Sequence, residues 1–247
     1  MKRQVKAVLE LWGLAVEWSA HRADEVVEYL RVDASNLWES PPRNIINLKN
    51  GLFDLDSREL LDHTPAHLSS VQLPVAYYAR ASCPAWEPFV GEVFPPDAQD
   101  LAWEIIAWLM TADTSMQKAI LFKGEGGNGK STYLRGVIAF LERHNVASLS
   151  LQKLETDRCA AARLVGKLAN ICPDLPSEHL AGTSMFKAIT GGDIVTAAYK
   201  YRDSFEFIPF ARLVFSANHL PRSSDGSPAF FDRWVVIPFR RSFRGTA

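Results

Sequence analysis

The 247-residue sequence contains only three cysteines, Cys83, Cys159 and Cys172, and they lie far apart. With an odd count and no CxxC pair, they support neither a disulfide framework nor a zinc site, so a reducing, cytoplasmic environment is expected. Histidines are few and isolated. His63 and His67 are four residues apart, but the proline between them breaks the helix that would align them as metal ligands.

Long apolar runs are also missing, and none approaches the ~18 residues that span a bilayer. The first 16 residues are not expected to be a signal peptide, because Lys6 and Glu10 interrupt them and the apolar positions recur at helical spacing. We therefore expect an amphipathic helix at the N-terminus and no membrane partner.

The sequence has almost no net charge, with 27 Lys+Arg against 28 Asp+Glu, so the average gives no sign of a nucleic-acid partner. This average hides a division. From Lys187 to the C-terminus there are nine basic and five acidic residues, whereas the preceding part has 18 basic and 23 acidic residues. Binding to phosphates is therefore expected in the last quarter of the chain.

The spacing of apolar residues predicts two helices in the first ~35 residues, with Asp24 capping the second. Short β-like runs are predicted between residues 45 and 61, another strand at 73–78, a connector at 83–96, and a helix capped by Asp97. The remainder alternates helices with short apolar strands at 119–122, 167–172, 212–216 and 234–237. This alternation predicts a mostly parallel sheet between helices, which is an α/β fold.

The segment Gly124–Ser131 reads GEGGNGKS and satisfies the phosphate-loop pattern GxxxxGK[ST] between a predicted strand and a predicted helix. Glycines allow successive N–H groups to converge on phosphate oxygens, and the helix N-terminus adds positive charge. Lys130 is expected to reach the β- and γ-phosphates of ATP, and Ser131 to ligate Mg²⁺. The alternative is a glycine-rich turn that binds nothing. The expected nucleotide-binding residues are Gly124, Glu125, Gly126, Gly127, Asn128, Gly129, Lys130, Ser131 and Thr132.

An apolar strand that ends in Pro173-Asp174 has the geometry of a Walker B motif, which makes Asp174 the expected metal-side acid. The alternative is a carboxylate that only caps a turn. Leu175 follows instead of a second acid, so the residue that polarises the attacking water is open between Glu178 and Asp193.

Downstream of these motifs, the segments Phe186–Asp193, Arg212–Pro221 and Phe230–Phe239, together with Lys200, resemble superfamily 3 helicases. The likeness is to the helicase part of phage, plasmid and poxvirus-type primase–helicases. Upstream, Asn50–Leu55 and Cys83–Trp86 resemble the small domain that precedes the ATPase in that group. The resemblance covers residues 45–239.

The resemblance implies a P-loop NTPase core of the AAA+-like kind at 97–247 and a small β-containing domain at 45–96. The helices predicted from the apolar spacing form a separate helical segment at 1–44. It also implies an ATP-dependent DNA helicase that hydrolyses ATP at the subunit interfaces of a hexameric ring and translocates on single-stranded DNA. A primase domain or protein is an expected partner, and the host cytoplasm the location if the chain is phage-encoded. The C-terminal region usual in the family is expected to be absent.

The resemblance also assigns roles to single residues. Asn218 matches the polar sensor of the γ-phosphate or attacking water; the alternative is an Asx turn before Pro221. Arg233 matches the arginine finger that one subunit supplies to the ATP of its neighbour; the alternative is a surface salt bridge with Asp232. The expected catalytic residues are thus Lys130, Asp174, Asn218 and Arg233.

Two β-like runs, 194–199 and 205–208, predict a hairpin with Lys200, Tyr201 and Arg202 at its tip. In the resemblance this tip tracks DNA in the ring channel, where charge holds phosphates and an aromatic ring stacks on a base. The alternative is a tip that is only solvated.

Two other functions remain open at this stage. One is a monomeric P-loop kinase for a small molecule, although no lid is recognisable between residues 141 and 167, where Arg158 and Arg163 are available. The other is an assembly module that binds ATP without turnover, which the missing second Walker B acid favours.

Overall fold

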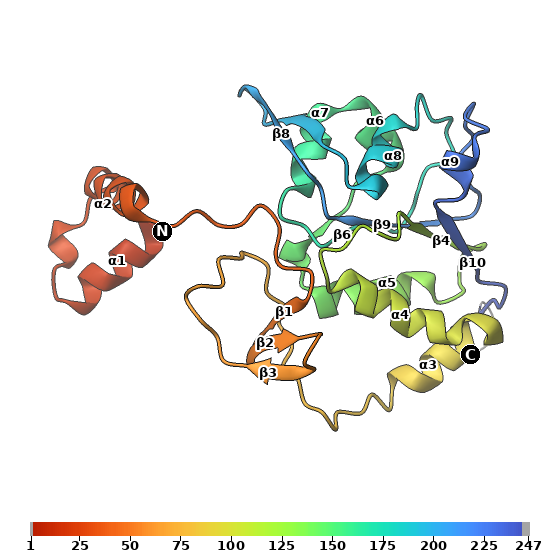
Figure 1. Ribbon diagram of the computed structural model, residues 1–247, viewed down its shortest axis with the longest axis horizontal. Coiled ribbons are helices and arrows are strands. Elements are labelled where there is room, and N and C mark those ends of the chain that lie inside the picture. Colours follow the sequence, from red (N-terminus) through yellow and green to blue (C-terminus); the bar gives the residue numbers. More distant parts are fainter. Residues whose placement is uncertain (1, 244–247) are drawn as a thin grey trace. The chain divides into compact units, whose positions relative to one another are not determined.

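The computed structural model describes residues 2–243, and the chain divides between Leu37 and Trp38 into two compact units. The first unit contains α1 (Lys2–Leu11), a 3₁₀ turn (Ala15–Glu17) and α2 (Ala20–Asp33) (Figure 1). Ser19 caps α2 by accepting a hydrogen bond of 3.1 Å from the Arg22 N–H. The prediction of Asp24 as the cap was wrong, because Asp24 lies inside the helix and pairs with Lys2 at 2.6 Å.

The second unit begins with an antiparallel meander of β1 (Ile45–Leu48), β2 (Gly51–Asp54) and β3 (Glu59–Leu61), which confirms the predicted short strands. The predicted strand at 73–78 is wrong. Main-chain hydrogen bonds from Leu73 N to Asn47 O (2.8 Å) and from Lys49 N to Val75 O (2.9 Å) place this segment beside β1. Pro74 has no N–H to continue such a ladder, so the segment stays irregular.

The predicted connector at 83–96 contains a helix, α3 (Trp86–Val93). Its proline, Pro88, lies in the first turn, where a missing N–H costs no helical hydrogen bond. A 3₁₀ turn (Pro96–Ala98) follows and leads into α4 (Gln99–Leu109). Asp97 therefore lies within the 3₁₀ turn and does not cap α4, which starts after Ala98 without a side-chain cap.

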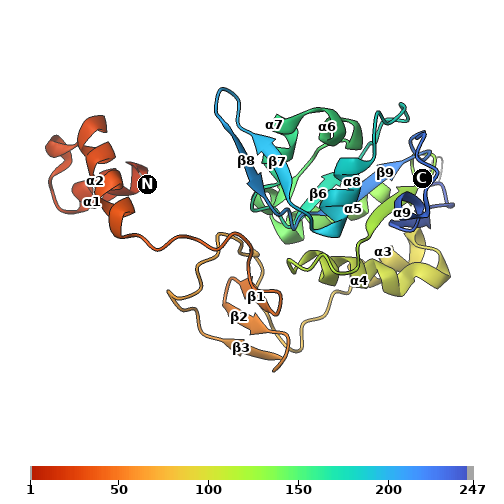
Figure 2. The same cartoon turned by 45° about the horizontal axis from the view of Figure 1, so that its top comes forward.

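The central sheet is parallel throughout and has the order β10-β4-β9-β6-β5 (Figure 1). Its strands are β4 (Ala119–Lys123), β5 (Val146–Ala147), β6 (Ala169–Cys172), β9 (Arg212–Ala217) and β10 (Trp234–Pro238). On one face lie α4 and α5 (Lys130–Leu141). On the other lie α6 (Leu151–Thr156), α7 (Arg158–Ala161) and α8 (Ser184–Gly191), as the two views show (Figures 1 and 2). This arrangement confirms the predicted α/β class with helices on both faces.

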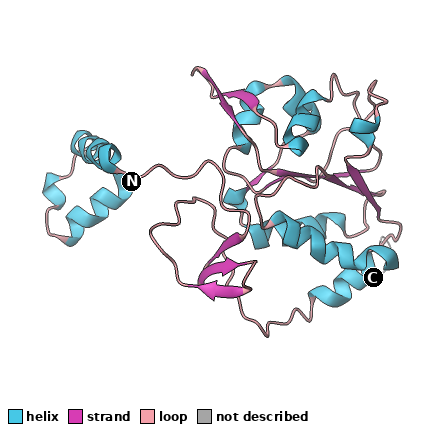
Figure 3. Cartoon of the chain, in the orientation of Figure 1, coloured by secondary structure: helices cyan, strands magenta, loops and turns pink. Residues whose placement is uncertain are grey.

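Each face of the sheet has its own apolar core. The core under α4 and α5 also contains Ile46 of β1, Val90 of α3 and Leu73 of the irregular segment beside β1. All three are 5% exposed or less. The strands of the meander, coloured in Figure 3, therefore belong to the same packed body as the sheet. The core on the other face includes Phe186 of α8 and Phe230 of the short helix α9 (Pro228–Phe231).

A two-stranded hairpin of β7 (Val195–Ala198) and β8 (Ser204–Phe207) follows α8 and confirms the predicted hairpin. It extends away from the sheet in both views (Figures 1 and 2). No helix within residues 2–243 is long and apolar enough to cross a membrane.

Candidate nucleotide-binding site

The phosphate-loop sequence forms the connection between the end of β4 at Lys123 and the start of α5 at Lys130. Gly126, Gly127 and Gly129 have φ values of +48°, +69° and +85°, a region that side chains with a Cβ rarely adopt. The glycines are therefore required by the backbone path, and they open the loop toward the N-terminus of α5. Such a path presents backbone N–H groups to an anion, and the helix end adds partial positive charge.

Helix α3 supports the loop and α5 from behind. A Cβ on Gly129 would lie 2.5 Å from the Val93 side chain, and a Cβ on Gly136 of α5 would lie 2.6 Å from the Trp86 ring. Trp86 also stacks on Tyr133 of α5 with ring centroids 5.5 Å apart. Sequence reasoning missed this role, although the spacing of the apolar residues in 86–93 is helical.

Lys130 is folded back onto its own loop. Its ammonium donates to the Asn128 Oδ1 at 2.9 Å and to the Gly124 carbonyl, and the residue is only 6% exposed. Burial lowers the pKa of Lys130, because the charged form loses hydration there. An anion in front of the loop would restore favourable interactions to this ammonium.

The residues that follow β10 form two hydrogen bonds with the same loop. Asn128 Nδ2 donates to the Phe239 carbonyl at 3.3 Å, and the Phe243 N–H donates to the Gly127 carbonyl at 2.7 Å. The loop is thus held on one side by α3 and on the other by residues 239–243.

The loop faces a cleft of about 450 Å³, a size in the range of small-ligand sites. The cleft lies where β4, β6 and β9 end, the edge at which parallel α/β sheets bind ligands. It brings together most of the predicted residues. The predicted residues that line it are Gly126, Gly127, Asn128, Gly129, Lys130, Ser131, Thr132, Asp174 and Asn218. Pro173, Ser216 and Ala217 line it as well, whereas the predicted Gly124 and Glu125 do not.

Oxygen ligands suited to Mg²⁺ are present in this cleft, because the Ser131 hydroxyl and the Asp174 carboxylate both line it. Among residues 2–243 no group of three or more His, Cys, Asp or Glu side chains could hold a metal by itself. The donor set therefore fits a cation that takes its other ligands from phosphate oxygens and water. Glu178 and Asp193 are not among the residues that line the cleft.

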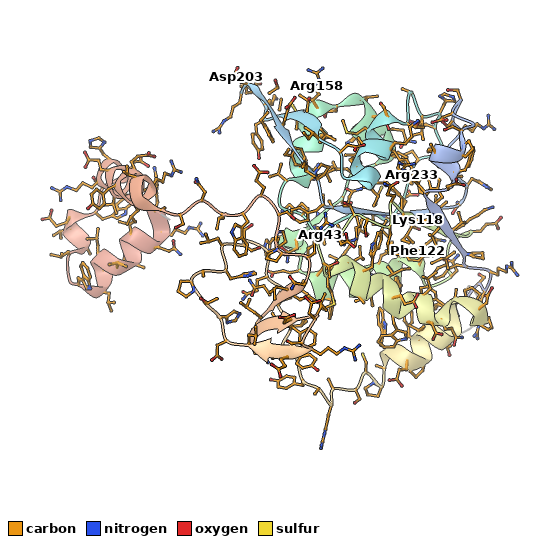
Figure 4. All side chains as sticks on the ribbon, in the orientation of Figure 1. Arg43, Lys118, Phe122, Arg158, Asp203 and Arg233 are labelled. Carbon is orange, nitrogen blue, oxygen red and sulfur yellow. The ribbon has the colours of Figure 1, made fainter. Side chains whose placement is uncertain are left out.

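Arg233 lies at the other end of the sheet from this cleft. Its carbonyl accepts from Ala119 N at 2.7 Å, beside the start of β4, whereas the phosphate loop follows the end of β4. In Figure 4, Arg233 and Lys118 mark the start of β10 and β4, and Phe122 lies near the end of β4. Four residue steps of strand span about 13 Å. Arg233 is therefore directed away from the cleft of its own chain.

The guanidinium of Arg233 is hydrogen-bonded within residues 2–243 and forms no ion pair with Asp232 there. Its Nε donates to Thr190 Oγ1 at 3.0 Å, one Nη donates to the Ala229 carbonyl, and the other to Gln117 Oε1 at 3.4 Å. The side chain is half-buried.

The predicted tip residues Lys200, Tyr201 and Arg202 lie together at the end of the β7–β8 hairpin, next to Asp203, which Figure 4 labels. Tyr201 is 91% exposed, and the Lys200 ammonium lies 5.0 Å from the centre of its ring. An exposed aromatic ring with two cations beside it can hold phosphates and stack on a base. None of the three residues lines the nucleotide cleft.

Two family models match this chain. "D5 N terminal like" matches residues 15–95, and a "Family of unknown function (DUF5906)" matches residues 122–233. The first covers the meander and all of α3, and the second covers the phosphate loop through Arg233.

Two curated viral relatives, both named as candidate helicases, are each 24% identical to this chain. The match to the relative from Acanthamoeba polyphaga mimivirus covers 81% of this chain and 22% of the relative. The match to the relative from Invertebrate iridescent virus 3 covers 96% of this chain and 27% of the relative. The chain thus spans about a quarter of the relatives it matches.

Solved structures of the NrS-1 C terminal region share the fold. One apo structure is 16% identical, with a TM-score of 0.52 over 68% of this chain and 40% of that chain. Another apo structure is 17% identical, with a TM-score of 0.52 over 83% of this chain and 47% of that chain.

Proposed function

We propose that this chain, which is of the phage and viral superfamily 3 helicase type, is an ATP-dependent DNA helicase motor of phage or plasmid-type replication. In this proposal it hydrolyses ATP at the subunit interfaces of a hexameric ring and translocates on single-stranded DNA. One observation carries the proposal: Lys130, Asp174 and Asn218 share a cleft, whereas Arg233 lies at the opposite end of the sheet.

The cleft supplies the parts that phosphoryl transfer needs on one side of the nucleotide. The loop N–H groups and Lys130 would hold the phosphates, and Ser131 and Asp174 would hold Mg²⁺, which neutralises charge on the β- and γ-phosphate oxygens when bound. Asn218, at the end of β9, would orient the attacking water by hydrogen bonding.

The missing part is a cation on the far side of the γ-phosphate. An arginine finger can raise the rate by ~10³–10⁵, because it stabilises the charge that develops on the transferred group. Arg233 cannot reach the cleft of its own chain, so a second copy has to bring it there. A closed ring of identical subunits gives every cleft one such arginine.

The hairpin tip supplies contacts to DNA at a separate place. Lys200 and Arg202 would bind backbone phosphates, and Tyr201 would stack on a base without selecting the sequence. Six tips in a ring would line a channel for one strand.

A mixing experiment tests the shared site. Arg233→Ala alone is expected to lose ATP turnover and keep ATP binding, and Lys130→Ala alone is expected to lose both. When the two variants are mixed before ring assembly, some clefts receive an intact loop and an intact finger, so turnover should partly return. Analytical ultracentrifugation with and without ATP and a dT oligonucleotide gives the mass of the assembly. Full activity of Arg233→Ala, or of a monomer, would contradict the shared site.

One observation favours a second candidate, an ATP-binding assembly module without turnover. Of the described residues that line the cleft, Asp174 is the single carboxylate, so no second acid stands ready to polarise water. ATP-dependent assembly without phosphate release from the wild-type chain would support this candidate. A small-molecule kinase is less well supported, because Arg158 lies in a groove between α7 and α8 and not in the cleft.

A further inference from the structure

Thr190, near the C-terminus of α8, is the partner of the Arg233 Nε. It is 5% exposed, and its hydroxyl is the side-chain partner nearest to the Arg233 guanidinium, at 3.0 Å. The two residues are 43 positions apart, so the contact joins α8 to the start of β10.

The direction of this hydrogen bond is fixed, because a guanidinium N–H can only donate and the Thr190 oxygen must accept. The Thr190 hydroxyl proton is directed to the Phe186 carbonyl at 2.7 Å, one helical turn earlier, and to the Lys187 carbonyl at 3.2 Å. With its proton committed there, the oxygen presents lone pairs to Arg233 Nε–H. The hydroxyl thus orients the guanidinium about its own Cδ–Nε bond, which leaves the two Nη groups to Ala229 and Gln117.

Helix α8 is itself tied down at its other end. The Glu155 carboxylate of α6 accepts from Phe186 N at 2.9 Å and from Met185 N at 3.2 Å, and so caps the first turn. An ionised carboxylate at a helix N-terminus is favourable for both the free N–H groups and the helix dipole. The first turn of α8 is therefore attached to α6.

The β7–β8 hairpin, whose tip is proposed to contact DNA, directly follows α8 in the chain. Gly192 ends α8 with φ +76°, and a Cβ there would lie 2.6 Å from Thr114 Oγ1. Strand β7 starts three residues later, at Val195. A close-packed glycine turn leaves little slack between the hairpin and the last turn of α8, which holds Thr190.

We propose that Thr190 is a positioning residue that orients the Arg233 guanidinium and couples it to the DNA hairpin through α8. This inference rests on the proposed function, because it takes Arg233 as the finger and the hairpin tip as the DNA contact. When the hairpin shifts on DNA, α8 shifts with it, and the Thr190 hydroxyl carries that shift to the finger.

The test compares Thr190→Val with Thr190→Ser in the full chain. Valine keeps the size and branching but removes the hydroxyl, whereas serine keeps the hydroxyl. A hydrogen bond to a charged group corresponds to roughly a ten- to hundredfold effect. Thr190→Val should therefore lower kcat for ATP by about tenfold or more and abolish the stimulation by a dT oligonucleotide. The KM for ATP should stay unchanged, because the cleft is intact. Thr190→Ser should restore kcat and stimulation.

Thr183→Val is the matched control, since Thr183 is also buried and directly precedes the same helix, where its hydroxyl donates to the Asp225 carboxylate. It should change the melting temperature but leave the stimulation by DNA in place. If Thr190→Val fails to fold, Thr190→Ala adds no atoms and makes the same comparison.

The inference is overturned if Thr190→Val keeps the wild-type kcat and stimulation, or if Thr190→Ser fails equally, which would make the role one of packing. The outcome is separable from the proposed function. An active Arg233→Ala removes the finger itself, whereas an inactive Arg233→Ala with a fully active Thr190→Val removes only the coupling.

Discussion

Replacing Gly129 by alanine should damage the phosphate loop through two separate effects. Gly129 has φ +85°, and a Cβ there would lie 2.5 Å from Val93 Cγ1 of α3. The left-handed conformation costs a non-glycine residue ~1–2 kcal/mol, and overpacking of a close contact costs ~1–3 kcal/mol. Gly129→Ala is therefore expected to lower the free energy of unfolding by ~2–5 kcal/mol.

A double-mutant cycle separates the two effects. Val93→Ala removes two methyl groups from a residue that is 5% exposed and should cost about 2 kcal/mol by itself. In that background an alanine at 129 meets no Val93 methyl, so only the conformational cost remains. The two substitutions together should then be less damaging than the sum of the single ones by ~1–3 kcal/mol.

Urea unfolding followed by circular dichroism gives these free energies, and titration with a non-hydrolysable ATP analogue reports on the loop. Gly91→Ala is the matched control on α3, the helix that contains Val93, because nothing lies within 4 Å of a Cβ at Gly91 and its φ is not positive. It should raise the free energy of unfolding by ~0.5–1 kcal/mol and leave nucleotide affinity unchanged. Strict additivity of Val93→Ala and Gly129→Ala would refute the claim that α3 supports the loop.

Two further predictions concern the hairpin and the acid range. Lys200→Ala should lower the affinity for a dT oligonucleotide and the rate of unwinding while basal ATPase stays near wild type, because the tip lies outside the cleft; unchanged unwinding would remove Lys200 from the DNA path. Hydrogen bonds from Ser227, Thr183 and Lys187 hold the pKa of Asp225 well below its usual range. The stability this carboxylate contributes is therefore present above about pH 4 and is lost as the pH falls below it. Melting temperatures between pH 6 and 2.5 should fall less steeply for Asp225→Asn than for wild type, and parallel curves would count against the role of Asp225.

The phosphate loop and the strands around it could be predicted from the sequence, because each depends on neighbours in the chain. Glycines mark the positive φ values, and β4 and α5 lie directly on either side. The sequence signal of helix α3 is weaker, because four prolines in residues 83–96 interrupt the helical spacing of its apolar residues. What stabilises the helix is packing of Trp86 and Val93 on α5 and Gly129, which are more than 35 residues away in the chain. A pattern read over ten residues contains no information about that surface.

The proposed arginine finger shows a similar limit. The resemblance pointed to Arg233, but not to its partners Thr190 of α8 and Gln117 of the loop before β4. Nor could it show that Arg233 and the cleft lie at opposite ends of one strand pair. Only the parallel pairing of β10 with β4 sets that direction.

Some of the basic side chains in the last quarter of the chain are buried or paired, so fewer of them can bind phosphates than the charge count predicts. Of the basic residues after position 186, Arg212 is 3% exposed, lies over the Trp108 ring and donates to the Thr111 carbonyl. Lys187 is paired with Asp225 at 2.9 Å. Burial lowers the pKa of Arg212 to about 10, which still leaves it charged near neutral pH, so its charge acts inside the fold and does not face a phosphate. Part of the excess of basic over acidic residues after position 186 therefore stabilises the fold. If the hairpin binds DNA as proposed, it offers Lys200 and Arg202, and a single hairpin with so few phosphate contacts would bind weakly. In that proposal, strong binding would require several hairpins on one strand, which is a physical reason for a ring that does not depend on the position of Arg233.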